Sequence, residues 1–352
     1  MIRSIDAYRY RLPLRSEVRL GPSLGAVRNG VCIRLSDGVF EGWGDAAPLP
    51  GFSRESIEDV LRAVDFLQAQ PPMEPSRLLS MPMPPSLQFA VDTALHELAA
   101  RQEGRPMLVD PAALIQTTLG VASLVDDAED AAPVQPSKSA VVKLKVGGNW
   151  RNDLRRVETL RERRGSDVRI RLDANRRFSV ADALDFLVGL AGLNVDFVEE
   201  PVAPGLALAD RLDVPIAADE TISELLTETV RDGQDLVRSV RERAPWASVL
   251  VLKPALLGTW KFTRSICDAA RAAGLRCVLG GAYESGVGVR AGLALAAIDA
   301  GHEAVGFDSY NRIERDLLRP RLEIGETVDV QDACRLDRTV DLELLDAVPS
   351  HE

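Results

Sequence analysis

The chain has 352 residues, of which 46% are hydrophobic and 27% are charged, and its formal net charge at pH 7 is -11. This length and apolar content are enough for two domains with sizeable cores. The acidic balance excludes the basic surface with which proteins bind nucleic acid or an anionic membrane, so we expect a small-molecule partner.

The N-terminus gives no targeting signal. Residues 1–6 lack the apolar region of a signal peptide, and no stretch approaches the ~18 uninterrupted apolar residues of a membrane span. We therefore expect a cytoplasmic protein. The cysteines form no CxxC pair, which favours small core residues over a zinc site or a disulfide framework.

The first hundred residues predict an α+β unit. Residues 26–43 are typical of a β-hairpin, because two apolar segments flank the turn sequence Ser36-Asp37-Gly38. Two helices follow, with predicted caps at Ser53 and Ser86. Residues 15–29, with several glycines, are predicted to form a lid loop or an ordinary surface loop.

From about residue 114 the pattern becomes short apolar strand, loop, amphipathic helix. The predicted strands are residues 115–119, 141–146, 168–173, 195–199, 215–219, 248–253, 276–279 and 304–308. Predicted helices between them include residues 180–190, 259–273 and 289–300. Eight such units indicate an α/β fold of the (β/α)8 type. A doubly wound open sheet is disfavoured, because no GxGxxG follows the first strand.

Charged residues end five successive strands of this predicted barrel. They are Lys145, Asp173, Glu199, Asp219 and Lys253. Because the active sites of such barrels lie at the carboxyl ends of the strands, we expect these side chains to converge. One such charge alone is more typical of a solvated loop or a helix cap, and only the joint register indicates a site. The three histidines, His96, His302 and His351, have no such support and are assigned no role.

The residue types at these positions indicate a reaction class. Asp173, Glu199 and Asp219 offer three oxygen ligands without nitrogen or sulfur, which predicts a Mg²⁺ site. A divalent cation and nearby ammonium groups stabilise the enediolate that forms when a proton is removed next to a carboxylate. We therefore predict Lys145 as the base, with Lys253 approaching from the opposite side. Lys143 shares the strand face of Lys145.

The motifs KxK, DxN, EEP, ADE and LKP, in this order, resemble those of the enolase superfamily, in particular its muconate lactonizing enzyme subgroup. The resemblance implies Mg²⁺ as cofactor, with Mn²⁺ as a substitute. It also implies a modified (β/α)7β TIM-type barrel with an N-terminal α+β capping domain. The expected domains are residues 1–110 for the cap with its lid loop, 111–318 for the barrel, and 319–352 for a C-terminal segment that returns to the cap.

Residues 42–53, GWGDAAPLPGFS, are similar to a segment of the o-succinylbenzoate synthases, enzymes of menaquinone and phylloquinone biosynthesis. This resemblance implies a metal-dependent carbon–oxygen lyase that dehydrates 2-succinyl-6-hydroxy-2,4-cyclohexadiene-1-carboxylate. Lys145 would take the α-proton and return it to the departing hydroxyl, and Lys253 would stabilise the enediolate.

The same resemblance implies substrate contacts outside the metal site. The residues that it assigns to the substrate or to the site's geometry are Lys143, Arg171, Asn175, Gly281 and Ser285. The last two lie in residues 280–285, similar to a serine-rich loop near the succinyl tail. Because glycines replace serines at positions 280 and 281, we expect backbone N–H groups to compensate.

Rival functions share parts of this pattern. An N-succinylamino acid racemase or a cycloisomerase has the same lysines and metal site. A dipeptide epimerase is disfavoured because residues 307–310, FDSY, lack the acidic DxD motif. An aldolase-like Schiff base at Lys145 or Lys253 leaves the three carboxylates unexplained. A non-catalytic ligand-binding relative is disfavoured because every acid, base and ligand is present.

Overall fold

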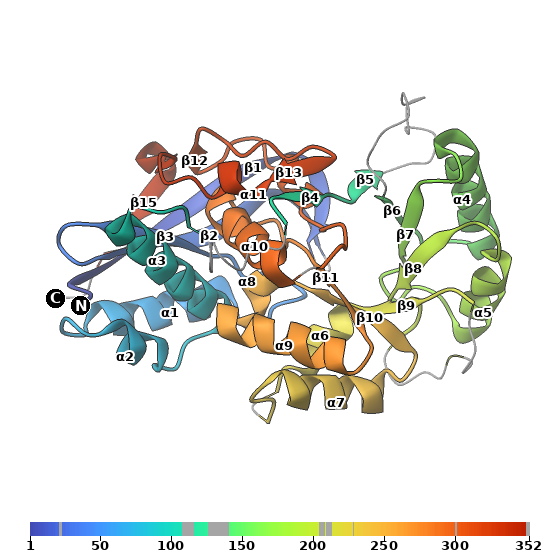
Figure 1. Cartoon of the computed structure of the whole chain (residues 1–352), viewed down its shortest axis with the longest axis horizontal. Coiled ribbons are helices and arrows are strands. Elements are labelled where there is room, and N and C mark those ends of the chain that lie inside the picture. The colour runs from blue at the N-terminus through green and yellow to red at the C-terminus, as the bar shows by residue number, and fades with distance from the viewer. Residues whose placement is uncertain are drawn as a thin grey trace.

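The structure, a computed structural model, describes residues 1–20, 23–107, 116–125, 141–203, 208, 213–227, 229–299 and 301–349. It has two parts, a sheet with three helices at the left of Figure 1 and a larger α/β part at the right. Both termini lie beside the smaller part, which we call the cap. The fold is therefore the predicted α/β barrel with an N-terminal α+β cap.

The cap is built on a four-stranded antiparallel sheet with the order β15-β1-β2-β3. Its strands are β1 (Ser4–Leu20), β2 (Ser23–Ser36), β3 (Glu41–Ala46) and, from the end of the chain, β15 (Leu345–Ala347). The β2–β3 pair confirms the predicted hairpin, and the pairing of β15 with β1 brings the C-terminal segment back to the cap. The described part of residues 15–29 is not a loop, because these residues extend the β1–β2 ribbon beyond a bulge between Pro13 and Val18. Their role as a lid stays a prediction.

Helices α1 (Ile57–Gln68) and α3 (Pro85–Glu103) pack on this sheet, and α2 (Pro75–Leu79) packs on α3. The predicted caps are corrected. Ser56, not Ser53, caps α1, because Asp59 three residues later completes a capping box, whereas the Ser53 hydroxyl accepts from the Leu49 N–H. Ser86 lies inside α3, which begins at Pro85.

Helix α3 lies unusually close to β3. A Cβ on Gly42 or Gly44 would be 1.9 and 1.8 Å from the carbonyl oxygens of Ala94 and Ala90, respectively. The Gly-Trp-Gly sequence is therefore required for this packing, because any side chain at either glycine would push the helix away.

The barrel sheet has seven parallel strands in the order β11-β10-β9-β8-β7-β6-β5. They are β5 (Ser123–Val125), β6 (Val141–Lys145), β7 (Arg169–Asp173), β8 (Val195–Glu199), β9 (Ile216–Ala218), β10 (Ala247–Leu252) and β11 (Arg276–Leu279). The apolar runs that predicted β6 to β11 are buried between the barrel interior and the surrounding helices, as in other parallel sheets.

The chain near residue 305 connects the two edges of this sheet. Val305 forms a parallel bridge with Val121, and Gly306 forms one with Gly280. The backbone hydrogen bonds from Ala122 to Val305 and from Gly281 to Gly306 measure 2.9 and 3.0 Å. The eighth predicted strand therefore closes the barrel.

The first predicted strand, residues 115–119, is displaced. Residue 115 lies outside the described residues, and β4 (Thr118–Gly120) pairs antiparallel with β13 (Thr327–Asp329) outside the barrel sheet. The barrel strand is the next apolar run, β5. The sequence could not separate two adjacent strand-like runs, because the partner of β4 is more than 200 residues away.

Helices follow the barrel strands, and α4 and α5 form the outer layer at the right of Figure 1. They are α4 (Trp150–Arg164), α5 (Val180–Gly189), α6 (Glu220–Leu225), α7 (Gly233–Arg243), α8 (Pro254–Leu257), α9 (Trp260–Ala272) and α10 (Gly286–Asp299). Side-chain caps at Asn149, Ser179, Asp232 and Thr259 begin four of them.

Short elements complete the chain: the 3-10 turns Asp308–Arg312 and Leu342–Leu344, β12 (Leu318–Arg319), α11 (Val330–Ala333) and β14 (Thr339–Val340).

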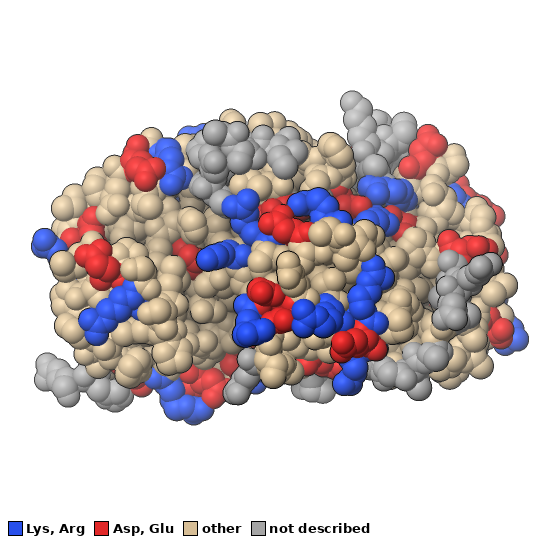
Figure 2. All heavy atoms as spheres, turned by 60° about the horizontal axis from the view of Figure 1, so that its bottom comes forward, with Lys and Arg blue, Asp and Glu red and all other residues tan. Residues whose placement is uncertain are grey.

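Among the described residues, no helix combines the length and apolarity needed to cross a bilayer. On the face shown in Figure 2, basic and acidic side chains lie interspersed.

Candidate active site

A cavity of about 410 Å³ lies where the carboxyl ends of the barrel strands face the cap. Cap residues Leu49, Gly51 and Phe52 form one wall. The barrel contributes all five charged strand-end residues predicted from the sequence, namely Lys145, Asp173, Glu199, Asp219 and Lys253. Because each of these residues ends a strand of the same barrel, all five lie in one pocket.

The strand register explains why the carboxylates converge. In the parallel sheet, Lys145 is paired with Asp173, and Asp173 with Glu199. Asp219 follows β9 directly and is the N-cap residue of α6. The three carboxylates are buried except where they line the cavity. The exposed fraction is 5% for Asp173, 2% for Glu199 and 5% for Asp219.

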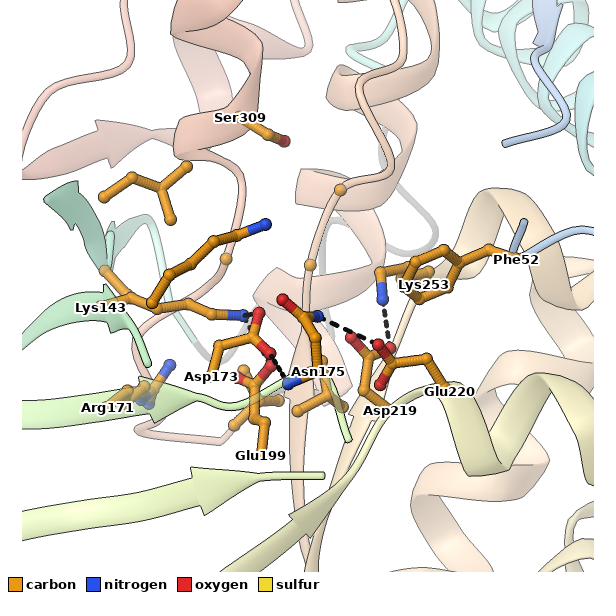
Figure 3. Close-up of a pocket in the computed structure, with 18 of the residues that line it drawn as sticks. Phe52, Lys143, Arg171, Asp173, Asn175, Glu199, Asp219, Glu220, Lys253 and Ser309 are labelled. Carbon is orange, nitrogen blue, oxygen red and sulfur yellow. Dashed lines mark hydrogen bonds and ion pairs between the residues drawn. The ribbon is translucent and has the colours of Figure 1, made fainter. Parts of the chain in front are cut away.

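Two lysines are paired with these carboxylates from opposite sides (Figure 3). The Lys143 ammonium lies 2.6 Å from Glu199 and 3.1 Å from Asp173. The Lys253 ammonium pairs with Asp219 and lies 4.2 Å from the centre of the Phe52 ring. Lys145 lies on the same face of β6 as Lys143 and lines the cavity.

Burial and mutual repulsion govern the electrostatics. Burial raises the pKa of Glu199 to about 8; the charge of Lys143 opposes this rise, and the charges of Asp173 and Asp219 add to it. Burial alone would lower the pKa of Lys143, but the charges of Asp173 and Glu199 raise it above its usual value. The buried carboxyl groups of the pocket therefore cannot all be ionised at once unless cations lie beside them.

The donor set suits a hard divalent cation, because three carboxylates from neighbouring strands face one cavity that has room for water or substrate. Within the described ranges, however, no three His, Cys, Asp or Glu side chains are already arranged around a common metal position. Lysine ammonium groups pair with the carboxylates instead. The metal ligands therefore stay a prediction.

Arg171 is directed away from the predicted substrate contact. Its guanidinium binds Asp196 at 2.8 Å, the Ala304 carbonyl at 2.7 Å and Glu303 at 3.1 Å, and only 1% of the residue is exposed. Although Arg171 borders the cavity, its donors are used in this buried network. The placement favours a role in holding the barrel strands together.

Asn175 positions the acidic residues. Its backbone N–H donates to Asp173 at 3.2 Å, and its side-chain amide donates to Glu220 at 3.1 Å. Burial, followed by the charges of Asp219 and Asp173, raises the pKa of Glu220 to about 7. These contacts agree with the supporting role that was predicted for Asn175.

Glu200 has a function that the sequence did not reveal. Its buried carboxylate accepts from the backbone N–H groups of Asp219 and Thr221, both at 2.8 Å, and from Arg176 at 2.9 Å. It thereby holds the turn that carries Asp219. The only signal was the second acid of the EEP motif, and a strand end explains that equally well.

The expectations for the loop after β11 need correction. The N–H groups of Gly280 and Gly281 donate to the carbonyls of Leu252 and Gly306, at 2.9 and 3.0 Å, so they do not replace serine hydroxyls. Ser285 is fully buried, and its hydroxyl donates to Asp45 of the cap at 2.7 Å. Gly281 does line the cavity, as does Tyr283, which the sequence did not single out.

Comparison with known proteins agrees with this architecture. Residues 126–333 match the enolase C-terminal domain-like family, and residues 2–98 match the MenC N-terminal domain family. The o-succinylbenzoate synthase of Citrobacter koseri is 29% identical over 329 residues, which cover 90% of this chain and 94% of that protein.

Two solved structures share the fold. The N-succinyl Arg/Lys racemase of Bacillus cereus has a TM-score of 0.79 at 22% identity, with 99% of this chain and 100% of that chain covered. The dipeptide epimerase of Cytophaga hutchinsonii, complexed with Mg and the dipeptide D-Ala-L-Val, has a TM-score of 0.79 at 20% identity, with both chains fully covered.

Proposed function

This chain belongs to the enolase superfamily, whose C-terminal domain family matches more than half of it, and we propose that it is an o-succinylbenzoate synthase. The proposed reaction is the Mg²⁺-dependent syn dehydration of 2-succinyl-6-hydroxy-2,4-cyclohexadiene-1-carboxylate, in menaquinone or phylloquinone biosynthesis in the cytoplasm. The proposal rests on one observation: lysines from two distant strands and three carboxylates line the same cavity. The match along 90% of the chain to a relative of that name supports it.

Lys145 is the proposed acid and base. It removes the α-proton of the substrate, and after the carbon–oxygen bond breaks it returns that proton to the departing hydroxyl as water. One group can perform both steps when the proton and the hydroxyl leave from the same face. Lys143, fully engaged with Asp173 and Glu199, is less suited to this task.

Lys253 contributes positive charge from the other side. Strands β6 and β10 are separated by three strands in the sheet, so Lys253 faces Lys145 across the cavity. Its ammonium is held between Asp219 and the Phe52 ring, an arrangement that favours a cation. A fixed cation there stabilises the enediolate as its charge develops.

Asp173, Glu199 and Asp219 would hold the metal ion. When bound, Mg²⁺ supplies a Lewis acid that stabilises negative charge on the substrate carboxylate. Asn175 and Glu200 orient two of these ligands through the hydrogen bonds described above. Mn²⁺ is expected to substitute, because it also accepts oxygen ligands.

A second candidate is N-succinylamino acid racemization, which the racemase with the shared fold and the two opposed lysines favour. A dipeptide epimerase has less support. Asp308, the acid at the position of the missing DxD motif, accepts from the Leu124 N–H and from the Asn311 side chain, both at 2.7 Å, and is therefore occupied. Schiff-base chemistry would leave the carboxylates without a role, and borohydride trapping tests it.

The deciding experiment offers the purified protein both substrates. With the cyclohexadiene and Mg²⁺, the ultraviolet absorbance of the substrate should fall without any other cofactor. With an N-succinylamino acid in ²H₂O, a dedicated synthase should incorporate no deuterium at the α-carbon. Exchange without dehydration would replace the proposed function by the racemase.

A further inference from the structure

Arg28 lies in β2, where the cap meets the barrel, and only 2% of it is exposed. Arginine has five N–H donors, and each of them reaches a backbone carbonyl here. The acceptors are Tyr283 (3.1 Å), Asn29 (3.0 Å), Pro48 (2.8 Å), Ala282 (3.3 Å) and Ala47. All five hydrogen-bond partners are backbone carbonyls, and the charge of Arg28 also acts on the buried carboxyl groups of Asp45 and Glu284, whose pKa values it lowers.

Four of these carbonyls belong to two neighbouring segments, one in the cap and one in the barrel, that lead into the lining of the cavity. The cap segment at Ala47 and Pro48 leads directly into Leu49, Gly51 and Phe52, which line the cavity. The barrel segment at Ala282 and Tyr283 follows Gly280 and Gly281, which line it from the other domain. One buried side chain therefore joins the cap segment to the barrel segment beside the cavity.

Asp45 of β3 holds the same barrel segment a few residues further on. Its buried carboxylate accepts from the N–H and the hydroxyl of Ser285, at 2.8 and 2.7 Å, and from the Tyr10 hydroxyl at 2.7 Å. Residues 282–285 are thus anchored to the cap at both ends.

Tyr283, between these anchors, has a positive φ of 61°. This conformation is unfavourable for a residue with a side chain, and it persists only where the surroundings hold it. Its carbonyl is an acceptor of Arg28, and its side chain lines the cavity. The anchors therefore hold Tyr283 in a strained conformation at the edge of the cavity.

We propose that Arg28 is a positioning residue that joins the cap and barrel segments of the pocket lining and thereby sets the positions of Phe52 and Tyr283 against the substrate. This inference rests on the proposed function for the identity of the substrate. Arg28 donates to none of the lysines or acids of the site, so its loss weakens substrate binding more than proton transfer.

The kinetic test uses Arg28→Met and Arg28→Lys. Lysine keeps the charge but has three donors on one nitrogen, so it cannot replace the five hydrogen bonds to the two segments. We expect KM to rise about tenfold or more, with kcat within about threefold, the pattern of lost substrate binding without a change in chemistry. Guanidinium ion should partly restore KM in the Met variant.

The matched control is Arg34→Met, in the same strand but paired with Asp6. A folded Arg28→Met enzyme with the KM of the wild type overturns the proposal.

Amide hydrogen exchange tests the clamp independently of the reaction. In Arg28→Lys, peptides that cover residues 47–52 and 281–285 should both exchange faster, whereas residues 169–173 of β7 should not change. If the wild type does not dehydrate the cyclohexadiene, the proposed function fails and this measurement still decides on the clamp. Faster exchange in only one of the two segments, or in neither, overturns it. Ser285→Ala, which loosens one anchor, should accelerate only residues 281–285.

Discussion

The pocket has two regions of different origin. The acidic and basic side at Lys145, Asp173 and Glu199 comes from adjacent parallel strands, each of which delivers its residue at its own carboxyl end. The opposite wall joins cap and barrel through Arg28 and Asp45, which contact residues about 240 to 255 positions away. Local strand structure therefore places the charged residues of the pocket, whereas long-range packing between the domains forms the wall opposite them.

The first region should be the more sensitive to single substitutions. Lys145→Ala removes the proposed proton carrier, and loss of a general acid–base typically costs 10² to 10⁴ in rate, so we expect kcat to fall by about 10³ or more. Product binding, measured by calorimetry, should change little. The control is Lys261→Ala on the exposed face of α9. Retention of more than a tenth of the activity would assign proton transfer to another group.

Removal of the metal tests the carboxylates of the same region. EDTA should abolish activity, and Mg²⁺ or Mn²⁺ should restore it. Asp219→Asn keeps the shape but removes one charge from the ligand set, so Mg²⁺ affinity should fall by about 10- to 100-fold, the range seen when metal sites lose supporting groups. Titration calorimetry against Asp185→Asn, an exposed control in α5, measures this. Equal affinity in both variants contradicts Asp219 as a ligand.

Packing within the cap tests the support of the second region, because Gly44 precedes Asp45 in β3. Gly44→Ala would place a Cβ 1.8 Å from the Ala90 carbonyl, so α3 must move, and the free energy of unfolding should fall by about 3 kcal/mol. Gly120→Ala is the matched control, because its nearest contact would be an ordinary 3.7 Å. Urea unfolding compares them. Similar stability of the two variants would mean that α3 can move away from β3 without a cost in stability.

Glu284, in the loop that Arg28 and Asp45 hold, gives this region a pH dependence. Burial raises its pKa from 4.5 to about 7, and Asp45 contributes in the same direction. Between these two values the unfolded chain releases the proton and the folded chain keeps it, so stability falls as pH rises from about 4.5 to about 7. Glu284→Gln keeps an acceptor for the Ala282 N–H, found at 2.6 Å, and removes this loss.

The variant should therefore gain about 3 kcal/mol at pH 8 relative to the wild type and differ little at pH 4. Chemical denaturation at both pH values measures the difference. Parallel stability curves for the two proteins across this range would contradict a raised pKa at Glu284.

The sequence alone determined the barrel and the five charged residues. Each apolar run forms a buried strand, and the charged residue that follows it lies at the carboxyl end of that strand, where the pocket is. Lys145, Asp173, Glu199, Asp219 and Lys253 all line the predicted pocket. The cap hairpin and the helices after residues 179 and 259 were predictable for the same reason, since hydrophobic period and cap residues act over a few positions.

Only the tertiary structure decided what Arg28, Asp45 and Ser285 do. Nothing local distinguishes a buried arginine that binds five carbonyls from one on a strand surface, and Ser285 was predicted to contact substrate although it faces Asp45. The first barrel strand was misplaced for a related reason, because the partner of Thr118–Gly120 lies at Thr327–Asp329. Hydrogen-bond partners that are distant in the chain leave no periodic trace in the sequence, so they emerge only when the two domains pack.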